Sequence, residues 1–308
     1  MAKKVEDYGR KTIKKGPLDV AFDVINVVFL CAFTFICIFP FYYVLINSIS
    51  SSLAVDGGLV TFYPVGIQFE TYTKIFQMKE LAGATMTSIA RTVLGTVFTL
   101  IGSLVPGYLM TKHEFPHRKF WYRFMIVTMY FSAGLIPGYL NIKMLGLTNN
   151  FWVYVLPSFV TPYNMILTKT YIEGLPPALE EAAYIDGAGY FKRFVNIVIP
   201  LSKPIIATVA VFAAVGQWNS YMDTVIYMNG GTWPTLQSML YQFLNQSQVL
   251  QQMIAKGGLD NAEALMANMS TKSTRFAITG VTVLPILFVY PFFQRYFTKG
   301  IMIGAVKG

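Results

Sequence analysis

The sequence predicts an all-α integral membrane protein with six transmembrane helices. Hydrophobic residues make up 54% of the 308 residues and charged residues only 13%, whereas a soluble domain has about 45–50% and about 25%. The apolar residues lie in long blocks, several of which exceed the roughly 20 residues needed to cross a hydrocarbon core. Prolines and glycines inside these blocks predict a bundle of kinked helices.

Six apolar blocks give the expected spans. The first block is too long for the apolar region of a signal peptide, so we expect a retained span. Two of the intervening loops are long, at about 49–87 and 228–275, and the later one has apolar residues at helical spacing over 236–244, which predicts an amphipathic helix. The spans are expected at about 24–46, 88–110, 120–142, 151–171, 204–227 and 276–297, between a basic segment 1–23 and a tail 298–308.

The distribution of Lys and Arg predicts the orientation. Of the 24 basic residues, 17 lie in the N-terminal segment, the second and fourth loops and the tail. Loops rich in Lys and Arg stay in the cytoplasm. We therefore expect both termini and the loop between spans four and five to be cytoplasmic, and the two long loops to be extracellular.

Three other classes of protein find little support. The net charge of +9 comes from residues between the apolar blocks, not from one basic face of the kind that binds nucleic acid. Cys31 and Cys37 both lie in the first block and predict neither a disulfide framework nor a metal site. His113, Glu114 and His117 match the HExxH zinc-protease pattern, but Pro116 disfavours the helix that this pattern needs.

The sequence contains no phosphate-binding loop of the G-x-x-x-x-G-K-[ST] type. We therefore expect no catalytic residue and no cofactor in this chain, and any ATP-derived energy must come from another polypeptide.

The segment 174–200 has a clear local pattern. Pro177 suits the first turn of a helix, and the carboxylates of Glu180 and Glu181 favour its positive N-terminal end. Gly187 can adopt the left-handed conformation that ends a helix. A second helical stretch is expected over about 190–197. Such short helices are marginal alone, so we expect this cytoplasmic helix-turn-helix to pack on the bundle or on a partner.

The spacing in this segment resembles the EAA motif of ABC importer permeases. The matching residues are Glu181, Ala182, Ala183, Gly187, Ile197, Ile199 and Pro200, with Ile199 standing where the family usually has Leu. The resemblance implies a coupling helix that docks into a groove of a separate ATPase subunit. The alternative is a charged interfacial hairpin with no such partner.

The C-terminal residues extend the resemblance to the carbohydrate-uptake branch of these permeases, which includes the maltose and multiple-sugar permeases. Segment 294–301 and the ending 304–308 resemble that branch, and segment 131–137 resembles permeases for polysaccharide fragments such as alginate. The resemblance implies a bacterial cell-membrane subunit that pairs with a second permease. It also implies two cytoplasmic ATPase subunits that use ATP and magnesium, an extracellular solute-binding protein, and a sugar or oligosaccharide as substrate.

A polar cluster in the fifth expected span is the candidate substrate pathway. Polar groups within a span are costly unless they face protein or water, and Trp beside an amide and a carboxylate suits a sugar ring. The alternative is hydrogen bonding between helices combined with interfacial anchoring by Trp and Tyr. The cluster comprises Gln217, Trp218, Asn219, Tyr221 and Asp223.

The rival functions are a secondary transporter, a membrane-embedded metalloenzyme and a purely structural membrane protein. An ion- or proton-coupled secondary transporter would typically show internal repeats or ionisable residues deep in several spans. A membrane-embedded metalloenzyme would rest on the two histidines alone. A purely structural membrane protein would leave the polar cluster unexplained.

Overall fold

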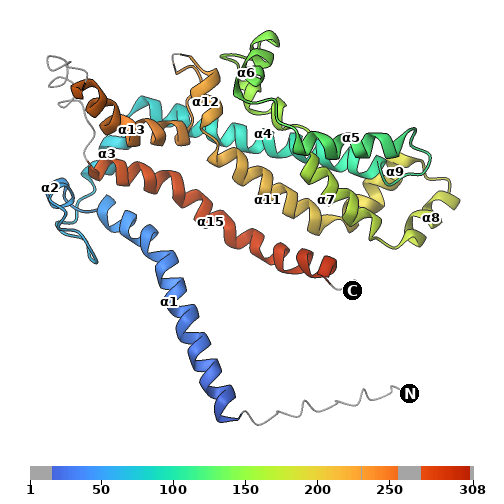
Figure 1. The fold of residues 1–308 in the computed structure, drawn as a ribbon, viewed down its shortest axis with the longest axis horizontal. Coiled ribbons are helices and arrows are strands. Elements are labelled where there is room, and N and C mark those ends of the chain that lie inside the picture. The colour runs from blue at the N-terminus through green and yellow to red at the C-terminus, as the bar shows by residue number, and fades with distance from the viewer. Residues whose placement is uncertain (1–15, 230, 256–271, 306–308) are drawn as a thin grey trace.

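The computed structural model describes residues 16–229, 231–255 and 272–305, and in these residues all regular secondary structure is helical. Three long helices pack side by side along much of their length, namely α4 (Lys79–Leu109), α11 (Lys203–Asn219) and α15 (Lys272–Ala305). Helix α7 (Pro162–Glu173) packs against α4 and α11. These four helices form the bundle in Figure 1.

Helix α1 (Pro17–Ser48) projects from the bundle and contacts it mainly through α15 (Figure 1). Its apolar side chains are mostly exposed, including Phe22 at 68% and Ile36 at 68%. Pro40 lies within the helix without ending it. The exposed surface of α1 therefore suits lipid or another membrane helix and does not suit water.

Further helices lie at the two ends of the bundle (Figure 1). One end, here the α13 end, carries α2 (Ser52–Asp56), α3 (Glu70–Gln77) and α13 (Leu236–Ala255). The other, the α8 end, carries α8 (Pro177–Ile185) and α9 (Tyr190–Arg193). Helix α13 confirms the helix expected at 236–244, and it packs on the bundle because Leu236 and Met239 are buried with Ile75, Leu81 and Ile278.

Several expected spans are not single helices, and these expectations were wrong in detail. The third is split into α5 (Arg118–Tyr130) and α6 (Leu135–Met144), which bend by 119° at a loop where Gly134 has φ of 87°. The fourth begins as the 3₁₀ turns η1 (Phe151–Tyr154) and η2 (Leu156–Ser158) before α7. Prolines 157 and 162 disfavour a continuous helix there.

The fifth expected span ends early as a helix, because α11 stops at Asn219 and α12 (Met222–Tyr227) follows. In the described residues, α1 and α4 are each long and apolar enough to cross a membrane. The number rises to four if each of two bent helix pairs counts as one span, α5 with α6 and 190–201 with α11.

Close contacts between backbones hold α4 against its neighbours. A Cβ atom on Gly102 would lie 1.9 Å from the carbonyl oxygen of Phe159, and one on Gly95 would lie 2.5 Å from the Gln217 side chain. A Cβ at Gly102 requires the backbone to shift and one at Gly95 requires the Gln217 side chain to move, so α4 is seated tightly along the middle of the bundle.

Candidate functional site

The segment 174–200 forms the expected helix-turn-helix at the α8 end (Figure 1). Pro177 is the first residue of α8, and Gly187 follows the helix with φ of 77°, which is the left-handed conformation. After α9 the chain continues as a π-helical turn, η3 (Phe194–Val198), and as α10 (Ile199–Leu201). The second helical stretch is therefore present, but its last turn is wider than an α-helix.

The outer face of this segment is open. Glu181 and Ala182 are exposed, whereas Ala183 is half-buried. Three large side chains beside them are also exposed: Tyr184 at 68%, Ile185 at 83% and Phe191 at 80%. Ile197 and Ile199 are half-buried, and Pro200 is exposed. An apolar patch of this kind, rimmed by a carboxylate, has the composition of a protein-binding surface.

Glu180 faces the opposite way and anchors α8 to the bundle. Its carboxylate accepts a hydrogen bond of 2.7 Å from the Tyr108 hydroxyl of α4 and pairs with the Lys112 ammonium. Arg193 of α9 lies 3.6 Å away. Partial burial raises the pKa of Glu180, but the hydrogen bonds from Lys112 and Tyr108 outweigh burial and lower that pKa below its ordinary value. The carboxylate is thus ionised near neutral pH.

The polar residues expected in span five separate into two groups. Trp218, Asn219 and Tyr221 contact other helices. The Trp218 indole donates a 3.0 Å hydrogen bond to the Thr282 carbonyl of α15, Gln237 donates a 3.2 Å hydrogen bond to Asn219, and Tyr221 stacks on Tyr241 with ring centroids 4.8 Å apart. These contacts are those expected of interhelical anchoring.

Gln217 and Asp223 converge instead on a residue that the sequence pattern did not reveal, Arg91 of α4. Arg91 is 2% exposed and donates to both Asp223 carboxylate oxygens at 3.1 and 2.5 Å. It also donates to the Gln217 amide oxygen at 3.1 and 3.2 Å. A further bond of 3.2 Å reaches the Ser220 carbonyl, which lies at the break between α11 and α12.

The same network extends to Tyr154 of η1. Its ring lies 4.3 Å from the Arg91 guanidinium carbon, and its hydroxyl donates to the Trp233 carbonyl at 2.6 Å. The Gln217 amide nitrogen donates to the Tyr154 carbonyl at 3.0 Å and to the Ser158 hydroxyl at 2.7 Å. The buried charge of Arg91 is therefore compensated by a carboxylate, an amide, a carbonyl and an aromatic face.

A cavity of about 590 Å³ borders this network. Arg91, Tyr154, Gln217 and Asp223 contribute to its wall from one side. Amide and hydroxyl groups contribute from others, including Asn141, Thr161, Asn164 and Tyr227. The cavity combines hydrogen-bonding groups with apolar surface, which is the chemistry that a sugar ring requires.

Comparison with known proteins identifies the family. The family described as the binding-protein-dependent transport system inner membrane component matches residues 12–303. The chain belongs to this family.

Relatives over nearly the full length include two proteins of Bacillus subtilis (strain 168). LplC is 35% identical over 288 residues, covering 93% of this chain and 95% of LplC. YtcP, a polygalacturonan/rhamnogalacturonan transport system permease protein, is 32% identical over 291 residues, covering 93% of this chain and 98% of YtcP. A crystal structure of a bacterial ABC transporter involved in alginate import contains a chain with 30% identity and a TM-score of 0.80, which covers 93% of this permease and 100% of that chain.

The residues of the HExxH match do not lie on one helix. Residues 113–117 lie in the turn between α4 and α5, and His117 adopts the left-handed conformation with φ of 54°. The two histidines therefore do not share a helix face as the zinc motif requires. Within the described residues, no three His, Cys, Asp or Glu side chains come close enough together to hold a metal ion.

Proposed function

We propose that this permease is one of two membrane-spanning subunits of an ATP-driven importer that carries oligosaccharides into a bacterial cell. The observation that supports it most directly is the exposed face of the EAA-like segment, on a chain that belongs to the binding-protein-dependent permeases. Membership of this family argues against the secondary-transporter and metalloenzyme alternatives. In this proposal the chain is not an enzyme, and ATP and magnesium are used by the ATPase subunits.

Six spans with both termini in the cytoplasm complete the proposal. Helices α1 and α4 supply the first and second spans, and the bent pairs α5 with α6 and 190–201 with α11 supply the third and fifth. The proposal assigns the fourth span to the segment from η1 to α7 and the sixth to α15. The Lys and Arg distribution supports the placement of the α8 end in the cytoplasm and the α13 end outside. The solute-binding protein then delivers its cargo at the α13 end.

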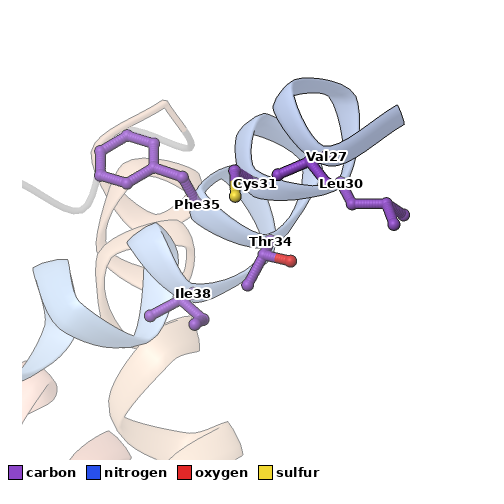
Figure 2. Close-up of a pocket in the computed structure, with 6 residues that line it drawn as sticks. All are labelled: Val27, Leu30, Cys31, Thr34, Phe35 and Ile38. Atoms are coloured by element: carbon purple, nitrogen blue, oxygen red, sulfur yellow. The ribbon is translucent and has the colours of Figure 1, made fainter. Parts of the chain in front are cut away.

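The exposed surface of α1 supports a second permease as partner. Figure 2 shows side chains of α1 that line a shallow, almost wholly apolar groove, comprising Val27, Leu30, Cys31, Thr34, Phe35 and Ile38. The small Cys31 and Thr34 allow another helix to approach closely. A heterodimer of two permeases covers such a face and encloses a translocation path between the subunits.

The substrate is proposed to be an oligosaccharide that carries carboxylates. YtcP is described as a polygalacturonan/rhamnogalacturonan permease and the structural relative as part of an alginate importer, and both names refer to acidic polysaccharides. The proposed translocation path is lined by Gln217, Asp223 and the cavity beside Arg91. Trp218, Asn219 and Tyr221 are proposed to support the path indirectly, through α13 and α15.

Crosslinking tests the coupling assignment directly. A cysteine at Ile185, in a Cys31→Ala and Cys37→Ala background, should crosslink to single cysteines in the groove of the ATPase subunit in a nucleotide-dependent manner. A cysteine at Leu53, which is 89% exposed at the α13 end, is the matched control and should not react with the ATPase. Absence of crosslinks from 185 across a full ATPase scan, with both proteins co-expressed, would refute the coupling role.

A further inference from the structure

The coupling helix α8 is attached to the membrane bundle without burying any of its own residues. Every residue of α8 is exposed or half-buried, and its main packing contacts are with α9 and the π-helical turn. A cavity of about 710 Å³ separates α8 from the turn after α4 and from the end of α7. A displacement of α8 is therefore not transmitted to α4 and α7 by packed apolar side chains alone.

The Glu180 side chain bridges this gap. Its carboxylate contacts Tyr108 at the end of α4 and Lys112 in the following turn, while Arg193 approaches from α9. Tyr108 is only 3% exposed and Arg193 only 8%. Charge-assisted hydrogen bonds are short and direction-specific, so a carboxylate held by two donors, with the Arg193 guanidinium 3.6 Å away, transmits position in a way that a mobile surface pair does not.

The partners of Glu180 are themselves fixed. The Tyr108 ring packs on Phe194 with centroids 4.9 Å apart, and the Lys112 ammonium lies 4.3 Å from the Tyr108 ring centroid. The Arg193 guanidinium lies over the Tyr190 ring at 4.4 Å. The carboxylate therefore joins α8 to a rigid group of side chains at the end of α4.

Helix α4 connects this point to the Arg91 network. Tyr108 and Arg91 belong to one continuous helix, and at 1.5 Å per residue they lie about 26 Å apart along its axis. Near its middle α4 holds Gln217 and Asp223 through Arg91, and it packs closely on α11 and α7. Movement of the Tyr108 end is thus conveyed to the break between α11 and α12.

We infer that Glu180 is a positioning residue that makes α4 follow the coupling helix, and that it determines how much ATP hydrolysis is converted into transport. The inference rests on the proposed importer function and adds a role that the EAA-like pattern does not give, since that pattern begins at Glu181. Glu181 is exposed, whereas Glu180 is half-buried and bonded to Tyr108 of α4.

The test uses the complete importer, reconstituted in liposomes with its binding protein, and measures oligosaccharide uptake and ATP hydrolysis in parallel. Glu180→Gln should leave ATPase subunits bound but lower uptake per ATP roughly tenfold, because the amide loses the charge that Lys112 and Tyr108 recognise. Glu181→Gln should instead weaken retention of the ATPase subunits. Glu70→Gln removes a carboxylate of an exposed pair on α3 and is the control with wild-type values.

A double-mutant cycle separates positioning from a general structural defect. Lys112→Met should reproduce the uncoupling, and the Glu180→Gln and Lys112→Met pair should be no worse than either alone. If Glu180→Gln reduces the yield of folded complex, Tyr108→Phe removes one of the two hydrogen-bond donors and should give a smaller loss of uptake per ATP.

Wild-type uptake per ATP in Glu180→Gln, or loss of bound ATPase subunits from that variant, would overturn the inference. A wild-type complex that hydrolyses ATP without importing any oligosaccharide would instead count against the proposed function. The two failures are therefore distinguishable in one set of measurements.

Discussion

Two ion-pair clusters in this permease differ in what surrounds them. The Arg91 cluster lies inside the bundle, where the guanidinium is 2% exposed and Asp223 is its carboxylate partner. The Glu180 cluster lies at the α8 end, where its cation Lys112 is 15% exposed, while the two carboxylates, Asp223 and Glu180, are both 20% exposed. The same type of interaction therefore fixes helix positions within the bundle in one region and tethers the peripheral helix α8 in the other.

The difference has an energetic consequence. A buried ion that loses its partner retains the full cost of desolvation, whereas a partly hydrated ion recovers solvation from water. Disruption of the Arg91 cluster should thus affect folding and assembly. Disruption of the Glu180 cluster should affect coupling and leave the fold intact.

The largest expected effect comes from removing the counter-ion of Arg91. Asp223→Asn leaves a buried guanidinium without its carboxylate and should destabilise the subunit by about 3–5 kcal/mol. Thermal unfolding of the purified complex and the yield of assembled importer measure this loss. Replacing both members by apolar residues, as in Arg91→Met with Asp223→Leu, should recover part of the stability, and a double variant as unstable as Asp223→Asn would contradict this account.

A slightly smaller effect is expected where α4 meets the turn before α7. Gly102→Ala places a methyl group 1.9 Å from the Phe159 carbonyl oxygen, so the backbone must shift, at a cost of about 1–3 kcal/mol. Gly83→Ala, also in α4, has no atom within 4 Å of the added Cβ and is the control. The midpoint of thermal unfolding should fall for the first variant and stay or rise for the second. Equal midpoints would show that α4 is not seated as described.

Removal of the Tyr154 hydroxyl measures how much this group adds to the stability of the Arg91 cluster. Tyr154→Phe keeps the ring beneath Arg91 but removes hydrogen bonds to the Trp233 carbonyl and the Thr224 hydroxyl. The loss of stability should be about 1–2 kcal/mol. Tyr63→Phe, at a side chain that is 70% exposed, should change the unfolding midpoint little. A larger loss than that of Asp223→Asn would show that the hydroxyl, and not the ion pair, dominates the network.

The smallest expected effect concerns Trp218. Trp218→Phe removes the indole hydrogen bond to the Thr282 carbonyl while keeping an aromatic ring, so stability should fall by about 1 kcal/mol. Uptake by the reconstituted importer should remain near the wild-type value, because the indole holds α11 against α15. A strong loss of uptake without loss of stability would instead place Trp218 in direct contact with the sugar.

Local sequence patterns predicted those helices whose position and ends are set by residues close together in the chain. Pro177 and Gly187 delimit α8 as expected, because helix starts and stops are set within a few positions. The apolar block at 24–46 lies within α1, and the helical spacing at 236–244 lies within α13. The helix breaks at Gly134 and Ser220 were missed, since hydropathy averages over a window and does not register one turn.

The two clusters could not be predicted in the same way. Arg91 lies near the start of the span expected at 88–110, and its partners lie 126 to 132 residues later in the chain. Lys112 and Glu180 are separated by 68 residues. Pairs of this kind leave no local periodicity, and only the packed bundle brings them together.

The hydrogen bond from Arg91 to the Ser220 carbonyl bears on how this permease can evolve. The Arg91 guanidinium of α4 donates a hydrogen bond to the backbone carbonyl at the point where α11 ends. A change at Arg91 alone, or at the break at Ser220 alone, should therefore give a less stable protein. Homologous permeases should therefore gain or lose Arg91, Asp223 and the interruption at Ser220 together, and an alignment would show this as a correlated change.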